Sequence, residues 1–330
     1  MATTQTTDPS TPMPKDPTFR NYAPAAAAAY AQYRPGYPDK LIDTVISQHT
    51  STGGGRDLLL DVGCGPGTAT RSLAPLFQHA VGVDPGQSMI ETARTIASST
   101  ARGEPVRYEV CAAEELDSVP GIAPESVDLV TAATAAHWFD LPRFYATAAK
   151  VLKPGGTIAL WASGHQYCDP YTTPNAVKVQ QLLFELELEI MRPYERAGNG
   201  HCRELYANLA LPWTILAEDE DIGEQLKIFD QDAFVRLEFN KDGALQPGEK
   251  FFRGRRSTLD QVKNAIGTIS HVTRWREAHK DQLEKGEVED CADMIVRRVR
   301  ETMEEVPEGK GRDWLEGGSS TVILIIKKRA

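Results

Sequence analysis

The chain has 330 residues, of which 41% are hydrophobic and 25% charged, a composition typical of a soluble globular protein. Its formal net charge is −10, so it lacks the basic balance that a nucleic-acid substrate requires. No apolar run approaches the roughly 18 residues needed to cross a bilayer, and the five cysteines are scattered without a Cys-x-x-Cys pair. We therefore expect no nucleic-acid, membrane or metal partner, no disulfides, and a cytoplasmic location.

The first residues differ in composition from the rest of the chain. Residues 1–20 are rich in Thr and Pro and lack the basic start and apolar core of a signal peptide, which predicts a disordered tail. The following residues, 21–38, contain an alanine run, three tyrosines and Arg34. The tyrosines could pack this segment onto the domain, and Arg34 could be either a surface residue or a cation that binds a ligand.

A glycine-rich turn after an apolar run is the most informative motif. Leu58–Val62 reads as a buried parallel strand, and Gly63, Gly65 and Gly67 follow at alternate positions. Glycine has no Cβ, so this turn can bend sharply and let a ligand lie against the backbone. A helix predicted to start near Thr68 would direct its N-terminal amides at the turn and favour a carboxylate there.

A second acidic strand end lies at the right distance from this turn. Val81–Asp84 is a short apolar strand, and a strand–helix–strand unit would place Asp84 beside the glycine turn. Its carboxylate could accept hydrogen bonds from both hydroxyls of a ribose, or it could merely cap the turn Asp84–Gly86. A nicotinamide-dependent oxidoreductase is a competing interpretation, but its fingerprint needs the third glycine one position later.

Further strands are predicted along the chain. They are Val106–Cys111, Ser126–Ala133, Val151–Trp161 with its Pro-Gly-Gly turn, and Thr321–Ile326. Strands that alternate with helical segments predict an α/β fold with a mostly parallel, Rossmann-like sheet and helices on both faces.

The motif, its spacing and the order of strands resemble the class I S-adenosylmethionine-dependent methyltransferases. The resemblance implies a seven-stranded sheet and S-adenosylmethionine as cofactor, with the glycine turn on the methionine part and Asp84 on the ribose. Where relatives often carry an Asp, this chain has Ala112, so the adenine contact is expected from the backbone at Ala113 and Glu114. The cofactor-binding residues implied in this way are Tyr30, Asp61, Gly63, Cys64, Gly65, Gly67, Asp84, Met89, Ala113, Glu114, Thr131 and Ala132.

Within that class, three segments resemble the trans-aconitate methyltransferase group. They are the Arg-Pro-x-Tyr-Pro element at 34–38, which would form a lid over the cofactor, the Ala-His-Trp-Phe-Asp loop at 136–140, and Thr268, Ser270 and His271. The resemblance implies methyl transfer to a carboxylate oxygen, with His137, Trp138 and Arg34 as candidate catalytic residues. His137 could deprotonate a hydroxyl, orient a carboxylate, or only pack.

The resemblance also divides the chain into parts. We expect the cofactor domain with its lid at 21–163, a mainly helical cap over the substrate side at 164–300, and a C-terminal strand that completes the sheet at 301–330. Ser257–Asp260 resembles a capping box that opens one long helix reaching His271. Of Arg253, Arg255 and Arg256, one could bind a polyacid, and surface roles are expected for the other two.

The predicted substrate is a small carboxylic acid, and the chain is expected to be a monomer or homodimer. Two other functions stay open. One is a methyltransferase that acts on a hydroxyl or amine with His137 as general base, and the other is a non-catalytic cofactor-binding regulator.

Overall fold

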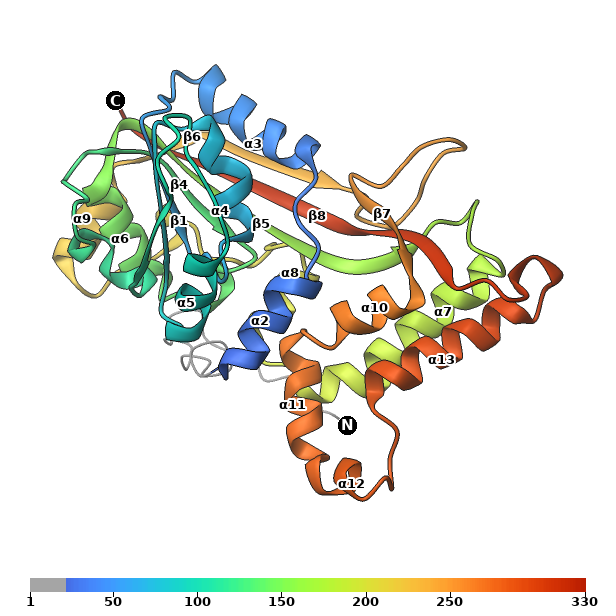
Figure 1. Ribbon diagram of the computed structural model, residues 1–330. Coiled ribbons are helices and arrows are strands. Elements are labelled where there is room, and N and C mark those ends of the chain that lie inside the picture. Colours follow the sequence, from blue (N-terminus) through green and yellow to red (C-terminus); the bar gives the residue numbers. More distant parts are fainter. Residues whose placement is uncertain (1–21) are drawn as a thin grey trace.

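One twisted sheet connects all parts of the chain. The computed structural model describes residues 22–330 (Figure 1), so the predicted tail at 1–20 lies outside the described residues. The eight strands have the order β3-β2-β1-β4-β5-β8-β6, and β7 also pairs with β8. The strands are β1 (Leu58–Val62), β2 (His79–Asp84), β3 (Arg107–Val110), β4 (Val127–Ala133), β5 (Leu152–Cys168), β6 (Phe229–Phe239), β7 (Arg253–Thr258) and β8 (Trp314–Lys328).

The strand directions match the expected Rossmann-like pattern. Strands β1 to β5 are mutually parallel, and only β8 runs against its neighbours β5, β6 and β7. The strands read as continuous apolar runs because helices cover both faces of the sheet. The predicted mostly parallel sheet with helices on both faces is therefore confirmed, with eight strands in place of seven.

Two helical layers bury the two faces. On one face lie α3 (Asp39–Ser51), α4 (Thr68–Leu73), the 3-10 turn η1 (Ala74–Leu76) and α5 (Gln87–Thr95). On the other face lie η2 (Ala113–Ser118), α6 (Leu141–Val151) and α9 (Glu220–Leu226). The apolar residues of β1 alternate between the two cores, because Leu59 packs on the first face and Leu60 on the second. Because β1 to β5 are parallel, their carboxyl ends lie at one edge of the sheet.

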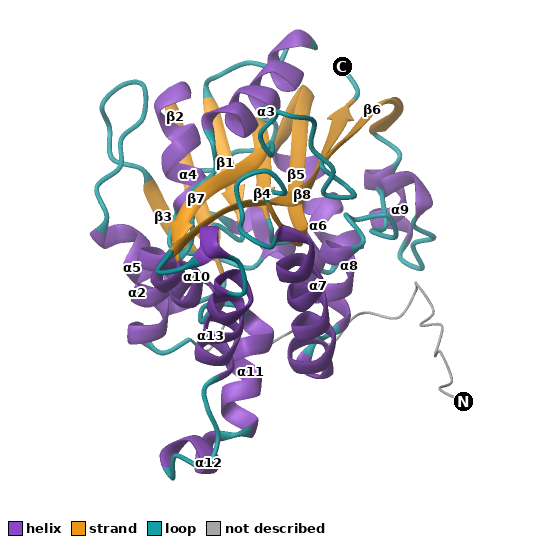
Figure 2. Cartoon of the chain, turned by 90° about the vertical axis from the view of Figure 1, so that its right-hand side faces the viewer, coloured by secondary structure: helices purple, strands orange, loops and turns teal. Residues whose placement is uncertain are grey.

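The outer parts of β5 and β8 run beyond this double layer. There β7 pairs with the first half of β8, whereas β6 pairs with the second half of β8, inside the double layer. Figure 2 shows the helices of this region grouped below the sheet, with α12 furthest from it. They are α7 (Ala176–Leu186), the π-helical turn η4 (Glu187–Met191), η5 (Arg192–Tyr194), α8 (Ala197–Arg203), α10 (Leu259–Ile266), α11 (Ser270–Ala278), α12 (Lys280–Glu284) and α13 (Cys291–Glu304). The remaining short elements are α2 (Pro24–Tyr33), η3 (Ala136–Trp138), η6 (Pro212–Thr214) and η7 (Pro307–Gly309).

The predicted cap differs from the observed arrangement in two ways. Residues 164–300 supply β6 and β7 to the main sheet as well as helices, and α13 continues past residue 300. β7 was missed because its sequence, Arg-Gly-Arg-Arg-Ser-Thr, lacks apolar alternation; charged side chains are common on edge strands because they deter pairing with other chains. The predicted long helix is instead two helices, α10 and α11, which are separated after Gly267, and Thr258 rather than Ser257 is the N-cap.

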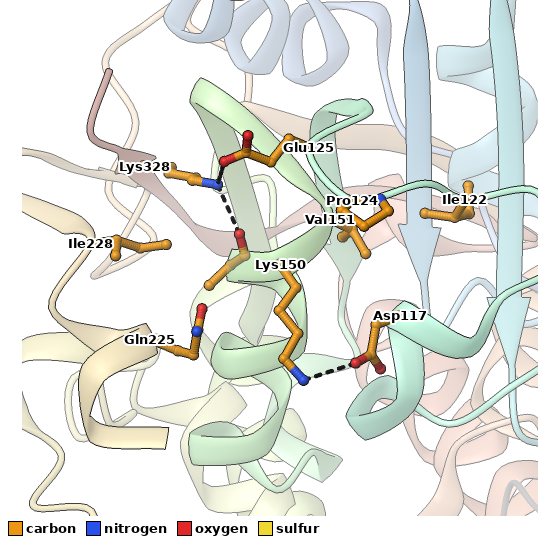
Figure 3. Close-up of a pocket in the computed structure, with 10 residues that line it drawn as sticks. Asp117, Ile122, Pro124, Glu125, Lys150, Val151, Gln225, Ile228 and Lys328 are labelled. Atoms are coloured by element: carbon orange, nitrogen blue, oxygen red, sulfur yellow. Dashed lines mark hydrogen bonds and ion pairs between the residues drawn. The ribbon is translucent and has the colours of Figure 1, made fainter. Parts of the chain in front are cut away.

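The C-terminal end of the sheet is fixed by a buried lysine. Lys328 Nζ donates to the carbonyls of Ala149 and Leu152 at 3.0 and 2.8 Å and pairs with Glu125 at 2.9 Å, at the wall of a surface depression (Figure 3). The Ala149 carbonyl belongs to the last turn of α6, where a cation also interacts favourably with the helix dipole. No helix in residues 22–330 has both the length and the apolar composition of a membrane span.

Candidate functional site

The glycine turn has an open backbone surface at its centre. Gly63, Gly65 and Gly67 have φ values of +64°, +54° and +81°, which non-glycine residues rarely adopt. A Cβ on Gly63 would lie 2.6 Å from the Cβ of Ala135, so this glycine allows close packing of β1 on the loop after β4. A Cβ on Gly65 would meet nothing within 4 Å. Gly65 therefore leaves space against which a ligand can lie.

Asp84 ties the end of β2 to the glycine turn. One carboxylate oxygen accepts from the Gly65 amide at 2.9 Å, and the other accepts from the Gly86 amide at 2.8 Å. The predicted neighbourhood of the turn and Asp84 is therefore present. The bond to Gly86 also closes the turn at 84–86. A carboxylate oxygen can accept more than one hydrogen bond, which is the property that binding to ribose hydroxyls requires.

Asp61 is a fully buried carboxylate between two hydroxyl groups. Thr70 Oγ1 and Thr131 Oγ1 donate to its two oxygens at 2.6 and 2.7 Å. Burial raises the pKa of Asp61 to about 6, in spite of these two hydrogen bonds. A buried carboxylate with this pKa gains stability when a positive charge binds nearby.

The other predicted cofactor residues surround this centre in different ways. Met89 on α5 and Ala113 on η2 are buried, and Glu114 Oε1 accepts from the amide of Asp140 at 2.9 Å. The side chains of Cys64 and Ala132 lie in the two hydrophobic cores, so contacts from these two residues to a cofactor would come from the backbone.

His137 lies inside the protein beside residues that are distant in sequence. Its Nδ1 is 2.9 Å from the Tyr206 hydroxyl and 3.2 Å from Cys202 Sγ, and its ring centroid is 4.6 Å from that of Trp138. Burial lowers the pKa of His137 to about 3, with His201 contributing. The imidazole is therefore neutral at physiological pH, which does not favour pairing of an imidazolium with a carboxylate. Trp138 is covered by α8, because a Cβ on Gly198 would lie 2.6 Å from the indole.

Two arginines that are far apart in the sequence lie near each other in the structure. Arg34 lies over the Tyr30 ring at 5.0 Å, and its Nη2 donates to the Thr268 carbonyl at 3.4 Å. Arg253 on β7 lies over the Tyr37 ring at 4.7 Å and donates to Ser163 Oγ at 2.5 Å. Burial lowers the pKa of Arg253, and the nearby Arg34 lowers it further. Among the described residues, neither guanidinium has an acidic partner.

Sequence reasoning did not find Tyr206 or Cys202. Tyr206 follows α8, and no motif there points to His137, which is 69 positions earlier. It also did not choose among the three arginines of β7. In the structure, Arg256 pairs with Glu316 at 2.9 Å and stacks on Trp314, whereas Arg253 faces Tyr37.

The residues present fit the cofactor that the resemblance implies. If S-adenosylmethionine binds here, its ribose hydroxyls would donate to Asp84, its positively charged methionine part would lie near the buried Asp61, and its surface would lie on Gly65. Within residues 22–330, no group of three or more His, Cys, Asp or Glu side chains could hold a metal ion.

Comparisons with known proteins agree with this geometry. Residues 60–160, from β1 to β5, match the family model described as a methyltransferase domain. The Saccharomyces cerevisiae protein named "Probable S-adenosylmethionine-dependent methyltransferase CRG1" is 28% identical over 83% of this chain and 87% of its own length.

A Dictyostelium discoideum protein whose name describes a methyltransferase is 36% identical over 47% of the chain, and the chain spans only 54% of that relative. A solved structure from Anaeromyxobacter dehalogenans, described as a type II methyltransferase, is 24% identical with a TM-score of 0.56 over 90% of this chain and 97% of its own. That likeness supports the fold.

Proposed function

We propose that the chain is a class I S-adenosylmethionine-dependent methyltransferase and that it methylates a carboxylate oxygen of a small organic acid; the methyltransferase-domain match and the yeast relative support the first part. The observation that carries the proposal is the pair of arginines, Arg34 and Arg253, which have no acidic partner among residues 22–330. In a chain with a net charge of −10, two such cations in one region favour an anionic ligand. A substrate carboxylate would satisfy both, since an unpaired buried charge is costly.

The bound cofactor supplies an activated methyl group on a sulfonium. The glycine turn would hold the methionine part and Asp84 the ribose, and Asp61 would balance the positive charge. Arg34 and Arg253 would orient the acid, and the fixed orientation of two reactants can lower a barrier by roughly 7–11 kcal/mol. A carboxylate with a pKa near 4 is ionised at neutral pH, so the reaction needs no strong base.

His137 would act in its neutral form in this proposal. A pKa of about 3 makes it a weak base, so the environment does not favour the alternative in which His137 deprotonates a hydroxyl or an amine. We propose that His137 and Trp138 shape the wall next to the acceptor. The Tyr30–Tyr37 segment would cover the site, because Tyr37 meets Trp161 of β5 edge-on at 5.5 Å.

The test is methyl transfer from labelled cofactor to a panel of dicarboxylic and tricarboxylic acids, monocarboxylic acids, phenols and amines. Carboxylate methylation gives a methyl ester that alkali hydrolyses, and mass spectrometry identifies the acceptor atom. Turnover confined to phenols or amines would refute the carboxylate proposal. Cofactor binding without turnover on any class would favour the regulator instead.

A matched pair of variants tests the arginine assignment. Arg253→Gln should raise the KM for the acid about tenfold or more, since hydrogen bonds to charged groups contribute roughly 1.5–3 kcal/mol. Arg256→Gln removes the same charge from the same strand and should leave the KM within about twofold, because Arg256 is bound to Glu316. Equal effects of the two changes would mean that Arg253 acts only through net charge.

A further inference from the structure

Tyr206 lies in an unusual backbone conformation directly after α8. Leu205 and Tyr206 are consecutive non-glycine residues with φ values of +52° and +57°. Their amides bond to the carbonyls of Cys202 and His201 at 3.0 and 2.8 Å, which closes the end of the helix. Glycine is the usual residue at such a position, and a side chain there costs about 1–2 kcal/mol. The backbone is therefore locally strained at Leu205 and Tyr206.

An arginine on strand β6 donates hydrogen bonds to the turn at 205–206. Arg236 on β6 donates from Nη2 to the Leu205 carbonyl at 2.5 Å and from Nη1 to the Tyr206 carbonyl at 3.3 Å. Its Nε donates to Glu238 Oε1 at 2.8 Å, which fixes the guanidinium plane. Both strained residues thus have their carbonyls bound by one planar group, which a lysine could not reproduce.

The strained turn directs the Tyr206 hydroxyl at His137. Tyr206 is 1% exposed, and its hydroxyl lies 2.9 Å from His137 Nδ1. Burial raises the pKa of Tyr206 well above its ordinary value, so the hydroxyl keeps its proton. A phenol that donates to Nδ1 leaves the imidazole proton on Nε2.

We propose that Tyr206 and Arg236 are positioning residues for methyl transfer. Arg236 holds the turn at 205–206, and the Tyr206 hydroxyl fixes the ring orientation and the Nε2–H tautomer of His137. The inference rests on the proposed function only in taking His137 as part of the reaction site. It holds for any acceptor class, because neither residue is assigned to the acceptor itself.

The experiment compares two buried tyrosines. Tyr206→Phe removes the hydroxyl at His137. Tyr145→Phe is the matched control, since Tyr145 is fully buried and donates to the Ala210 carbonyl at 3.1 Å. At equal folded fraction, Tyr206→Phe should lower kcat about tenfold or more without changing the cofactor Kd. Tyr145→Phe should leave kcat within about twofold. Equal kcat losses in the two variants would overturn the proposal.

A second readout needs no substrate. Nitrogen-15 NMR of the histidines should show the Nε2–H tautomer for His137 in the native protein, and Tyr206→Phe should change this signal. An unchanged His137 signal in Tyr206→Phe would refute the inference even if no acceptor is ever found. Failure of the carboxylate proposal alone would leave this signal and the kcat comparison with another acceptor intact.

Arg236→Lys supplies the third arm. It keeps the charge but loses the two-carbonyl contact, so it should lower kcat in the same direction as Tyr206→Phe. Because both residues act through His137, the double variant should lose much less than the product of the two single losses. Fully multiplicative losses would show that Arg236 acts independently of Tyr206 and would overturn its assigned role.

Discussion

Replacement of Asp61 by Asn should remove part of the pH dependence of stability. Asp61 is fully buried between Thr70 and Thr131, and burial raises its pKa from an ordinary 3.8 to about 6. The folded protein therefore holds a proton on Asp61 that the unfolded chain releases between about pH 4 and 6. Stability from this group is present below pH 4 and is lost as pH rises through 6.

The size of the effect follows from the pKa difference. A change from 3.8 to about 6 corresponds to roughly 3 kcal/mol at pH 7. Asp61→Asn removes the charge and keeps the shape, so the native protein should lose up to that amount relative to the variant between pH 4 and 7. The side-chain amide can still bond to both threonine hydroxyls, because a hydroxyl can donate or accept.

The assay is urea denaturation of both proteins at several pH values from 4 to 8, with the difference in unfolding free energy plotted against pH. Groups common to both proteins cancel in this difference. A difference that stays flat across the range would refute the reasoning about Asp61. In parallel, calorimetry should show weaker binding of S-adenosylmethionine by Asp61→Asn, because the variant no longer balances the positive charge of the cofactor.

Three further predictions use other parts of the structure. Gly65→Ala and the matched control Gly103→Ala both add a Cβ at positive φ in open space, and each should lower the unfolding free energy by about 1–2 kcal/mol in urea denaturation. Only Gly65→Ala should also weaken cofactor binding, about tenfold or more by calorimetry. Equal cofactor affinities of the two variants would argue against a ligand at Gly65. Lys328→Met should lower the unfolding free energy by about 2–3 kcal/mol, since it removes the ammonium donor from the Ala149 and Leu152 carbonyls. A loss below about 0.5 kcal/mol would contradict the role given to Lys328. The pKa of His137 is about 3 in the folded protein, against 6.5 ordinarily, so the stability that this residue contributes is present above pH 6.5 and falls by about 1.4 kcal/mol per pH unit below it. His137→Gln should remove this contribution to the slope between pH 6.5 and 4.5. An unchanged slope would mean that His137 is not buried in its neutral form.

The strands and turn around the predicted cofactor site were predictable because the sequence patterns that mark them are local. An apolar run followed by alternate glycines marks both the strand β1 and its turn, and Asp84 ends the next strand at a spacing that fits one helix. Parallel strands in a right-handed order then bring Asp84 and Gly65 together without further information. The hydrogen bond between the Gly65 amide and Asp84 confirms that these two residues are neighbours in the structure.

The environment of His137 and of the β7 arginines depends on contacts between distant segments. Ala-His-Trp-Phe-Asp indicated that His137 was of interest, but its charge state depends on burial beside Tyr206 and Cys202, which lie more than 60 positions later. Similarly, the sequence offers three arginines on β7, and the packing of β7 beside β8 decides that Arg253 reaches Tyr37 while Arg256 pairs with Glu316.

The sequence by itself thus determined the parallel strands around the glycine turn, the turn itself and the acid beside it, because backbone conformation and burial pattern there are set by neighbouring residues. Tertiary structure alone decided that His137 is neutral and that, among residues 22–330, Arg34 and Arg253 lie near each other without an acidic partner. Those properties arise from desolvation and from partners that only chain folding brings within a few ångströms.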